Sequence, residues 1–235
     1  MWSRREPNAI CQIGSKKDLT EPNVRATELE LYEGLEASSQ NCWPNVKFDI
    51  GGINNFISPL IPAGFYYKTF MWPKSFWKKV YEPLIRLSAG LGKSPTEPDP
   101  DIYDHKYVHY DVLVIGGGVS GIIAAKMAAK NNLKTLLVDD KKILGGSTIY
   151  QNNESIKIDD KLSSEWLKNE IQEIKKLSNL TIKTRTSIAA YHGYNFLLAK
   201  ENLTDHLPEE KKKNKIRQRL WTVSYTHLTL PTTSF

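Results

Sequence analysis

The chain has 235 residues, of which 40% are hydrophobic and 25% charged, and its formal net charge is +6. This composition is ordinary for a folded protein of one or two domains. No apolar run approaches the length of a membrane span and no hydrophobic leader is visible, which argues against a membrane protein or a secreted one. Two cysteines, Cys11 and Cys42, are too few for a secreted disulfide framework. We therefore expect a cytoplasmic protein.

The first part of the chain offers few regular elements. Residues 1–50 are irregular, apart from an alternating stretch, Ala26–Leu31, that predicts a short strand. Residues 51–108 combine an aromatic-rich stretch, Gly64–Leu91, with a linker rich in proline and acid, Ser94–Asp104. Docking on another protein and packing within this chain explain the aromatic stretch equally well. The linker is the clearest domain boundary.

The most informative motif lies in residues 109–222. An apolar run, Val112–Ile115, reads as a buried strand, followed by glycines in the pattern G-x-G-x-x-G and by a segment suited to a helix. In dinucleotide-binding domains these glycines permit a tight turn, close approach to the phosphates and close packing of the helix. The free N–H groups and the dipole at the helix N-terminus favour the anion. The pattern predicts pyrophosphate contacts from Gly116, Gly118, Val119, Ser120 and Gly121.

An acidic residue follows the next predicted strand. Lys134–Val138 reads as a second buried strand that ends at Asp139, at about the twenty-residue offset expected for a ribose ligand. Its negative charge would repel a 2′-phosphate, so the motif favours NAD or FAD over NADP. Gly146 and Ser147, in a Gly-Gly-Ser turn, are predicted to lie near the dinucleotide. The alternatives are a glycine turn without a ligand, a surface aspartate and an ordinary loop.

Later segments complete the predicted fold. Ser163–Leu177 has helical periodicity with a serine available as its cap, and Leu180–Thr184 reads as the next strand. Ser187–Lys200 and Gln218–Thr222 resemble strands of a β-meander. The order predicts an α/β fold, namely an incomplete Rossmann-like FAD/NAD(P)-binding domain with a parallel sheet and the ligand at its carboxyl edge.

No catalytic or metal-binding constellation is visible, and we expect cofactors to carry any redox chemistry. His105 and His109 flank Tyr107 without a carboxylate or cysteine in a ligand pattern, which favours structural roles over a metal site. A basic run, Lys211–Lys213, follows two glutamates, and a solvated turn explains it better than a nucleic-acid site.

Residues 223–235 form a separate C-terminal tail. Val223–Thr232 reads as the in-frame translation of the transposon-end adapter used in preparing sequencing libraries. We therefore expect the natural sequence to stop near Trp221 or Thr222, and the residues after it to have no functional role. A genuine polar, strand-like tail is the alternative.

Several blocks of the chain carry a family resemblance. The most specific is Pro62–Pro73 (PAGFYYKTFMWP), which is followed by Phe76-Trp77 and Val80–Arg86. Ala26–Leu31 upstream and Arg217–Trp221 downstream belong to the same pattern. Together these blocks resemble the α subunit of heterotetrameric sarcosine oxidase, and the resemblance covers nearly all of the chain before the tail.

The resemblance implies an oxidoreductase acting on CH–NH groups. The family demethylates sarcosine oxidatively to glycine, passing the methyl carbon to tetrahydrofolate and electrons to oxygen. The resemblance implies NAD at the glycine motif, FAD and FMN elsewhere in a complex with β, γ and δ subunits, and a folate-binding region outside this chain. Residues 1–50 would be the remnant of a ferredoxin-like plug domain without an iron–sulfur cluster, which requires four thiolates. Residues 51–108 would be an aromatic docking segment and linker.

Other interpretations stay open. One is a subunit of a related FAD- or NAD-dependent amine or opine dehydrogenase that uses an acceptor other than oxygen. Another is a non-catalytic assembly subunit. We expect the chain alone to be inactive, and its unfinished sheet would leave an unpaired edge prone to aggregation. No nucleic-acid or membrane partner is expected.

Overall fold

The computed structural model describes residues 10–14, 20–40, 44–45, 47–49, 73–88, 90–92, 94–150 and 156–229. The chain divides into two compact units, Met1–Pro100 and Asp101–Phe235, and the predicted linker spans this division. Within the described ranges, no helix has the length and apolar character needed to cross a membrane.

The first unit contains a small antiparallel sheet. Its strands are β1 (Ile10–Ile13), β2 (Glu21–Arg25) and β3 (Ala37–Ser39), in the order β2-β1-β3. Two further short strands, β4 (Pro44–Asn45) and β5 (Phe48–Asp49), pair with each other. The strand predicted from residue 26 to residue 31 is wrong, because a turn follows β2 there. The ferredoxin-like plug domain stays a prediction.

A helical segment ends the first unit. Lys74–Phe76 forms a 3-10 turn, Trp77–Tyr81 a wider turn, and α3 spans Glu82–Ser88. Phe76 and Trp77 are 48% and 41% exposed. The aromatic residues from Phe65 to Trp72 lie outside the described residues, so the docking role of this segment stays a prediction.

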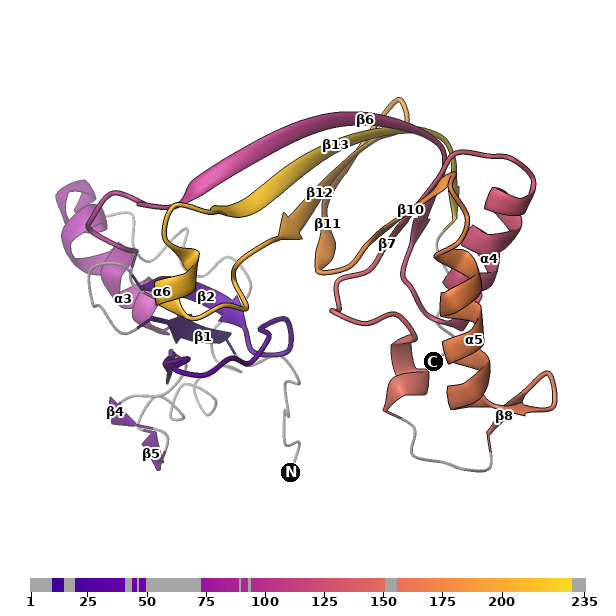
Figure 1. Ribbon diagram of the computed structural model, residues 1–235. Coiled ribbons are helices and arrows are strands. Elements are labelled where there is room, and N and C mark those ends of the chain that lie inside the picture. The colour runs from indigo at the N-terminus through magenta and orange to yellow at the C-terminus, as the bar shows by residue number, and fades with distance from the viewer. Residues whose placement is uncertain are drawn as a thin grey trace, which may run out of the picture. The chain divides into compact units, whose positions relative to one another are not determined.

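The second unit is built on one mixed sheet, in the order β10-β7-β6-β13-β12-β11 (Figure 1). Strands β10, β7, β6 and β13 are mutually parallel, which confirms the predicted parallel sheet. Strands β12 and β11 follow β13 in antiparallel pairing, which confirms the predicted meander. The segment Ser187–Lys200, expected in the meander, lies in a hairpin of two strands, β11 and β12. The strands are β6 (Ile102–Ile115), β7 (Thr135–Val138), β10 (Leu180–Lys183), β11 (Thr186–His192), β12 (Phe196–Asn202) and β13 (Ile216–Thr229).

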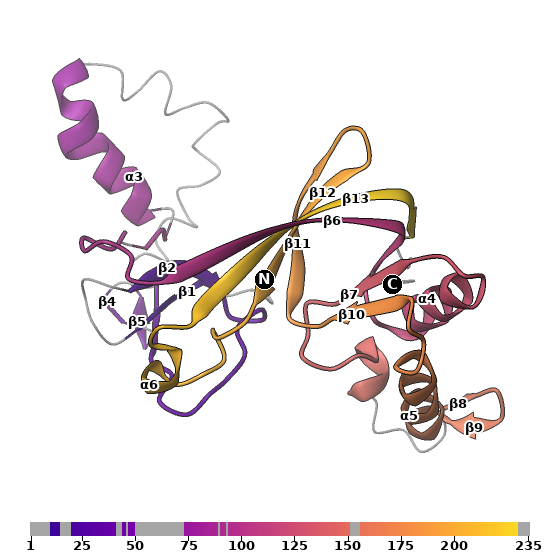
Figure 2. The ribbon, with the colours of Figure 1, turned by 45° about the horizontal axis from the view of Figure 1, so that its top comes forward.

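Two helices cover one side of the parallel strands. α4 (Val119–Lys130) and α5 (Ser163–Ile174) lie side by side next to β7 and β10 (Figures 1 and 2). The predicted serine cap of α5 is wrong, because Leu162 holds the cap position and makes no side-chain hydrogen bond. Two shorter elements precede α5, β8 (Lys157–Ile158) and β9 (Lys161–Leu162).

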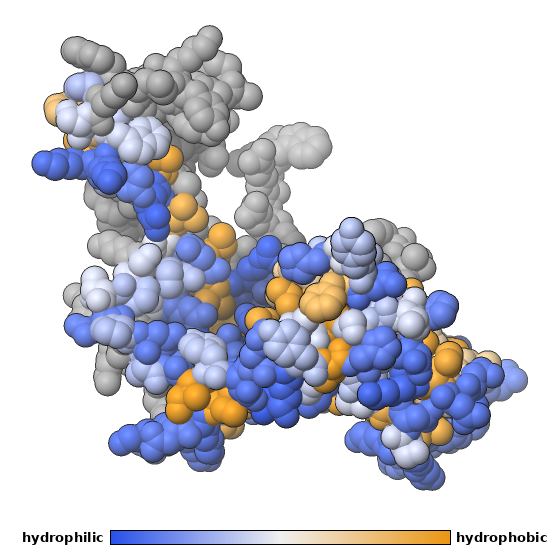
Figure 3. Space-filling model, turned by 90° about the horizontal axis from the view of Figure 1, so that it is seen from above, coloured by the Kyte–Doolittle hydropathy of each residue, from blue (hydrophilic) through white to orange (hydrophobic). Residues whose placement is uncertain are grey.

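Two hydrophobic clusters hold the layers together. One joins the strands to the helices and includes Val114, Ile122 and Ile174, each fully buried. The other joins β6 and β7 to the meander, and Leu113 and Leu197 lie at its centre. Burying side chains of this size stabilises the fold by about 1.5–3 kcal/mol each. Seen from the side of β6 and β13, the described surface is mostly hydrophilic, with hydrophobic residues in separate patches (Figure 3).

The last strand includes part of the C-terminal tail. β13 continues past Trp221 to Thr229, and its register places Val223 beside Val108 and Tyr225 beside Tyr110 of β6. Val223 is fully buried and Tyr225 is 4% exposed. These tail residues therefore complete the sheet. The adapter origin of their sequence stays a prediction.

Candidate functional site

The glycine loop joins the end of β6 to the start of α4, at the carboxyl edge of the parallel strands. Gly116 has a φ of 100°, a conformation that favours glycine. Its N–H donates to the carbonyl of Val138 at the end of β7, over 2.8 Å. Gly121 is buried in the first turn of α4, where the absence of a side chain lets the helix approach the sheet. The predicted order of strand, glycines and helix is confirmed.

The N-terminus of α4 has no side-chain cap. Gly118 holds the cap position in extended backbone, and the first turn contains no acidic residue. The N–H groups of Val119, Ser120 and Gly121 have no partners within the helix, because no carbonyl precedes them in it. These groups and the helix dipole can bind an anion. A Cβ built on Gly118 would meet no atom within 4 Å, so the backbone at this residue is open to close approach.

The Gly-Gly-Ser turn lies against the glycine loop. Gly145 donates its N–H to the carbonyl of Gly117 over 2.7 Å. Gly146 has a φ of +55°, and a Cβ built on it would lie 3.2 Å from the Cα of Gly118. Gly146 also begins the 3-10 helix η5 (Gly146–Ile149), in which Ser147 is exposed. The structure therefore brings Gly146 beside the loop, while contacts of Gly146 and Ser147 with a ligand stay predictions.

Asp139 follows the last residue of β7 and is 8% exposed. One carboxylate oxygen accepts the N–H of Gly117 over 2.5 Å, and the other accepts the N–H of Lys141 over 2.7 Å. Burial raises the pKa of this carboxyl, and the two N–H donors oppose the rise. Each carboxylate oxygen has a second lone pair, so the carboxylate retains the capacity to accept further hydrogen bonds, such as those of ribose hydroxyls.

Sequence reasoning missed Gly117, the central residue of the glycine run. Its N–H donates to Asp139 and its carbonyl accepts from Gly145, so one peptide segment joins three parts of the site. A Cβ there would collide with the side chain of Leu144 and lie 3.0 Å from a carboxylate oxygen of Asp139. The signal in the sequence was the glycine at position 117 itself, because the fingerprint spacing accounts for Gly116, Gly118 and Gly121 but leaves the residue between the first two open.

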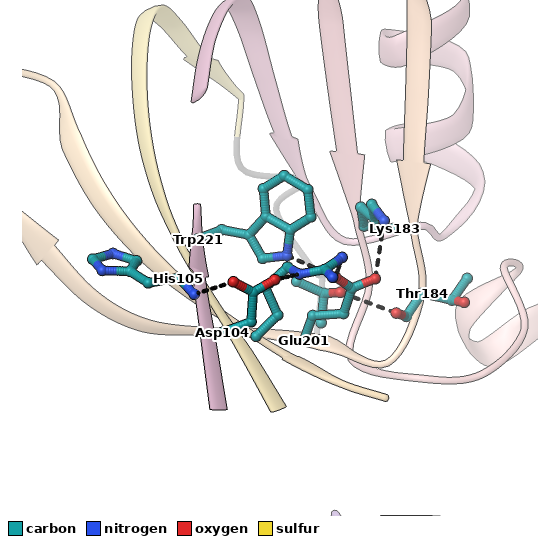
Figure 4. Close-up of polar contacts among 8 residues, drawn as sticks. Asp104, His105, Lys183, Thr184, Glu201 and Trp221 are labelled. Carbon is teal, nitrogen blue, oxygen red and sulfur yellow. Dashed lines mark hydrogen bonds and ion pairs between the residues drawn. The ribbon is translucent and has the colours of Figure 1, made fainter. Parts of the chain in front are cut away.

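Glu201, Trp221 and Lys183 form a buried polar cluster that holds the end of β10, the strand whose last residue bonds to Asp139 (Figure 4). Glu201 of β12 is 7% exposed, accepts the indole N–H of Trp221 over 2.7 Å and pairs with Lys183 of β10 over 3.0 Å. The Lys183 ammonium also lies 4.9 Å from the centre of the Trp221 ring. Three strands, β7, β6 and β13, lie between β10 and β12 in the sheet order. The ion pair between Lys183 of β10 and Glu201 of β12 therefore requires the sheet to curve. The carbonyl of Lys183 then accepts the backbone N–H of Asp139 over 2.9 Å.

The histidines of β6 bond to hydroxyl groups of β13. His105 Nε2 lies 2.8 Å from the Thr222 hydroxyl, and His109 Nδ1 lies 2.8 Å from the Ser224 hydroxyl. Among the residues that the structure describes, no three His, Cys, Asp or Glu side chains are grouped to hold a metal ion. The basic run lies in α6 (Glu209–Lys212) and the turn after it.

Comparison with known proteins defines the class of the second unit. Residues 111–221 match the family described as FAD dependent oxidoreductase. The parallel strands and the glycine loop give this segment a Rossmann-like fold, and the match makes it similar to FAD dependent oxidoreductase domains.

More specific similarity covers nearly the whole chain. Over 93% of its length the chain is 42% identical to sarcosine oxidase subunit alpha of Rhizobium meliloti (strain 1021), of which it covers 22%. Over 62% of its length it is 30% identical to the subunit of the same name from Corynebacterium sp. (strain U-96), of which it covers 15%. The solved L-proline dehydrogenase from P. horikoshii is 22% identical, with a TM-score of 0.42 over 55% of this chain and 23% of that one. The identities to the two sarcosine oxidase α subunits confirm the predicted resemblance to them.

Proposed function

We propose that this chain binds the pyrophosphate and adenosine ribose of a dinucleotide, as part of a sarcosine oxidase α subunit. One observation carries the proposal: open space lies over Gly118 at the uncapped end of α4, and the Asp139 carboxylate is bonded to the same loop. NAD is the proposed ligand. FAD is the alternative at the same site, and the family matched by residues 111–221 favours it.

Each group at the site has a defined task in this proposal. The N–H groups of Val119, Ser120 and Gly121 donate to the pyrophosphate, and Gly118 leaves room for its close approach. Asp139 accepts from the ribose hydroxyls, while Gly146 and Ser147 border the dinucleotide. The dinucleotide, when bound, supplies the electron-transfer chemistry, and this chain supplies binding and orientation.

The wider reaction is proposed for the assembled protein. In it, an α subunit carrying this region would act with β, γ and δ subunits in the cytoplasm. The complex would oxidise the CH–NH bond of sarcosine, pass the methyl carbon to tetrahydrofolate and electrons to oxygen, and use FAD and FMN. Identity of 42% over 93% of this chain supports the assignment.

Calorimetric titration of the 235-residue chain with NAD⁺, FAD and NADP⁺ tests the site. We expect NAD⁺ or FAD to bind, and NADP⁺ to bind more weakly by about tenfold because of its 2′-phosphate. If neither NAD⁺ nor FAD binds, the proposal is wrong. If NADP⁺ binds as tightly as NAD⁺, the ribose assignment of Asp139 is wrong.

A glycine variant separates ligand binding from folding. Gly118→Ala places a methyl group in the open space and meets no protein atom, so the melting temperature should not change while dinucleotide affinity falls. Gly193→Ala is the matched control, since a Cβ at Gly193 also meets nothing within 4 Å and lies in the turn between β11 and β12. Unchanged affinity in Gly118→Ala would refute the pyrophosphate position.

A further inference from the structure

Three segments of the candidate site meet at Gly117. Its N–H bonds to the carboxylate that follows β7, its carbonyl bonds to Gly145 of the second glycine turn, and the preceding N–H, that of Gly116, bonds to the end of β7. The loop is thus fixed at three successive points by contacts within the protein.

We propose that Gly117 is a positioning residue that sets the Asp139 carboxylate for ribose recognition. The inference rests on the dinucleotide-binding function proposed above and adds a residue outside the G-x-G-x-x-G spacing. Gly117 acts through Asp139 and through the Gly145 turn, and makes no ligand contact of its own in this proposal.

The space around Gly117 explains why only glycine fits. A Cβ there would overlap Leu144, which is 4% exposed and packs in the cluster between strands and helices. Interiors of this kind are close-packed, so Leu144 has little freedom to retreat. The second neighbour of the Cβ is the Asp139 carboxylate, at 3.0 Å. A side chain at position 117 would therefore displace the carboxylate.

The backbone of Asp139 cannot follow such a displacement. Its N–H donates to the carbonyl of Lys183 over 2.9 Å, and its carbonyl accepts the N–H of Thr186 over 2.8 Å. Rotation of the carboxylate away from the loop relieves its own contact with the new Cβ, while the overlap with Leu144 remains. The bond to Gly117 is then lost together with the orientation toward the ribose.

A double-mutant cycle on the 235-residue chain tests this coupling. Affinities for NAD⁺ and FAD are measured for wild type, Gly117→Ala, Asp139→Ala and the double variant, with Gly193→Ala as the control. We expect Gly117→Ala to weaken binding by about tenfold, the equivalent of about 1.4 kcal/mol. We expect no further loss when it is added to Asp139→Ala, because the group through which it acts is already absent.

The ratio of NAD⁺ to NADP⁺ affinity gives a second readout. Displacing the carboxylate should bring this ratio toward one in Gly117→Ala, whereas general weakening of the fold would lower both affinities equally. Additive losses in the cycle, or an unchanged ratio, would overturn the role of Gly117 while leaving the proposed function intact. A wild-type chain that binds neither NAD⁺ nor FAD would overturn both.

A second variant covers the case in which Gly117→Ala does not fold. Adding Leu144→Ala removes the overlap with the core and leaves only the contact between the new Cβ and Asp139. We expect this double variant to fold and still bind about tenfold more weakly than Leu144→Ala alone. Equal affinity of the two would overturn the proposal.

Discussion

Replacing Glu201 by leucine tests whether the buried polar cluster holds the second unit together. Leucine has a similar size, so the change removes the carboxylate without leaving a large cavity. It leaves the indole N–H of Trp221 and the ammonium of Lys183 without the acceptor that each now has at 2.7 and 3.0 Å.

The change also removes the ion pair between Glu201 and the Arg219 guanidinium, which are 3.8 Å apart. The three lost interactions differ in their expected contribution, and this long pair contributes the least. A buried N–H donor that bonds to a charged acceptor contributes about 1.5–3 kcal/mol. The Lys183 side chain is 26% exposed and can turn toward water, so its pair with Glu201 contributes only about 1 kcal/mol or less. The sum is about 2–4 kcal/mol, a large part of the roughly 5–15 kcal/mol that stabilises a typical domain.

Urea unfolding measures this loss, with tryptophan fluorescence as the signal because Trp221 is itself in the cluster. Glu201→Gln is the matched control, since an amide oxygen can still accept the indole N–H while the charge is gone. We expect Glu201→Leu to lose about 2–4 kcal/mol and Glu201→Gln about 1 kcal/mol. A Leu variant within about 0.5 kcal/mol of wild type, the range of ordinary surface substitutions, would refute the reasoning.

Further predictions concern the tail and the pH dependence of the site. A chain ending at Thr222 should aggregate, as measured by size-exclusion chromatography. It loses two buried side chains, Val223 and Tyr225, worth about 1.5–3 kcal/mol each, and it exposes the edge of β6. A monomeric chain with an unchanged free energy of unfolding would contradict this prediction. The pKa of Asp139 is raised from 3.8, so ionising this carboxyl favours the unfolded state, and unfolding free energy should fall as pH rises through the raised pKa. Asp139→Asn should abolish this part of the pH profile. Dinucleotide affinity should change in the opposite sense and decrease in acid, because the neutral carboxyl is a weaker acceptor, and a pH-independent Kd would exclude Asp139 from the site.

The Rossmann-like core could be predicted because its signals are local. Apolar runs for β7 and β10, the glycines before α4 and the helical periodicity of α5 each lie within a short stretch of chain. The start of β6 could not be predicted in the same way. Residues from Ile102 to Tyr110 form no continuous apolar run, since most are polar or aromatic and only Ile102 and Val108 are aliphatic. Their strand depends on pairing with Ile216–Thr229, far along the chain. Local patterns do not specify such long-range pairing.

In the candidate site too, local spacing could be predicted from the sequence and contacts between distant segments could not. The spacing of Gly116, Gly118 and Asp139 predicted groups that the structure brings together at one edge of the sheet. The spacing does not report the volume around each residue, so it could not show that Leu144 and the carboxylate leave no room at Gly117. The polar cluster around Glu201 could not be predicted from the sequence either, because its partners come from separate strands.

These observations converge on Asp139. Its backbone N–H and carbonyl are held by Lys183 and Thr186, and its carboxylate is held by the N–H groups of Gly117 and Lys141. Under the proposed function, a side chain fixed in this way would lose little conformational entropy on binding a ribose, so its hydrogen bonds would contribute more fully to affinity. Burial of the charge opposes this gain by raising the pKa of the carboxyl. The N–H donors of Gly117 and Lys141 offset that effect by lowering the pKa.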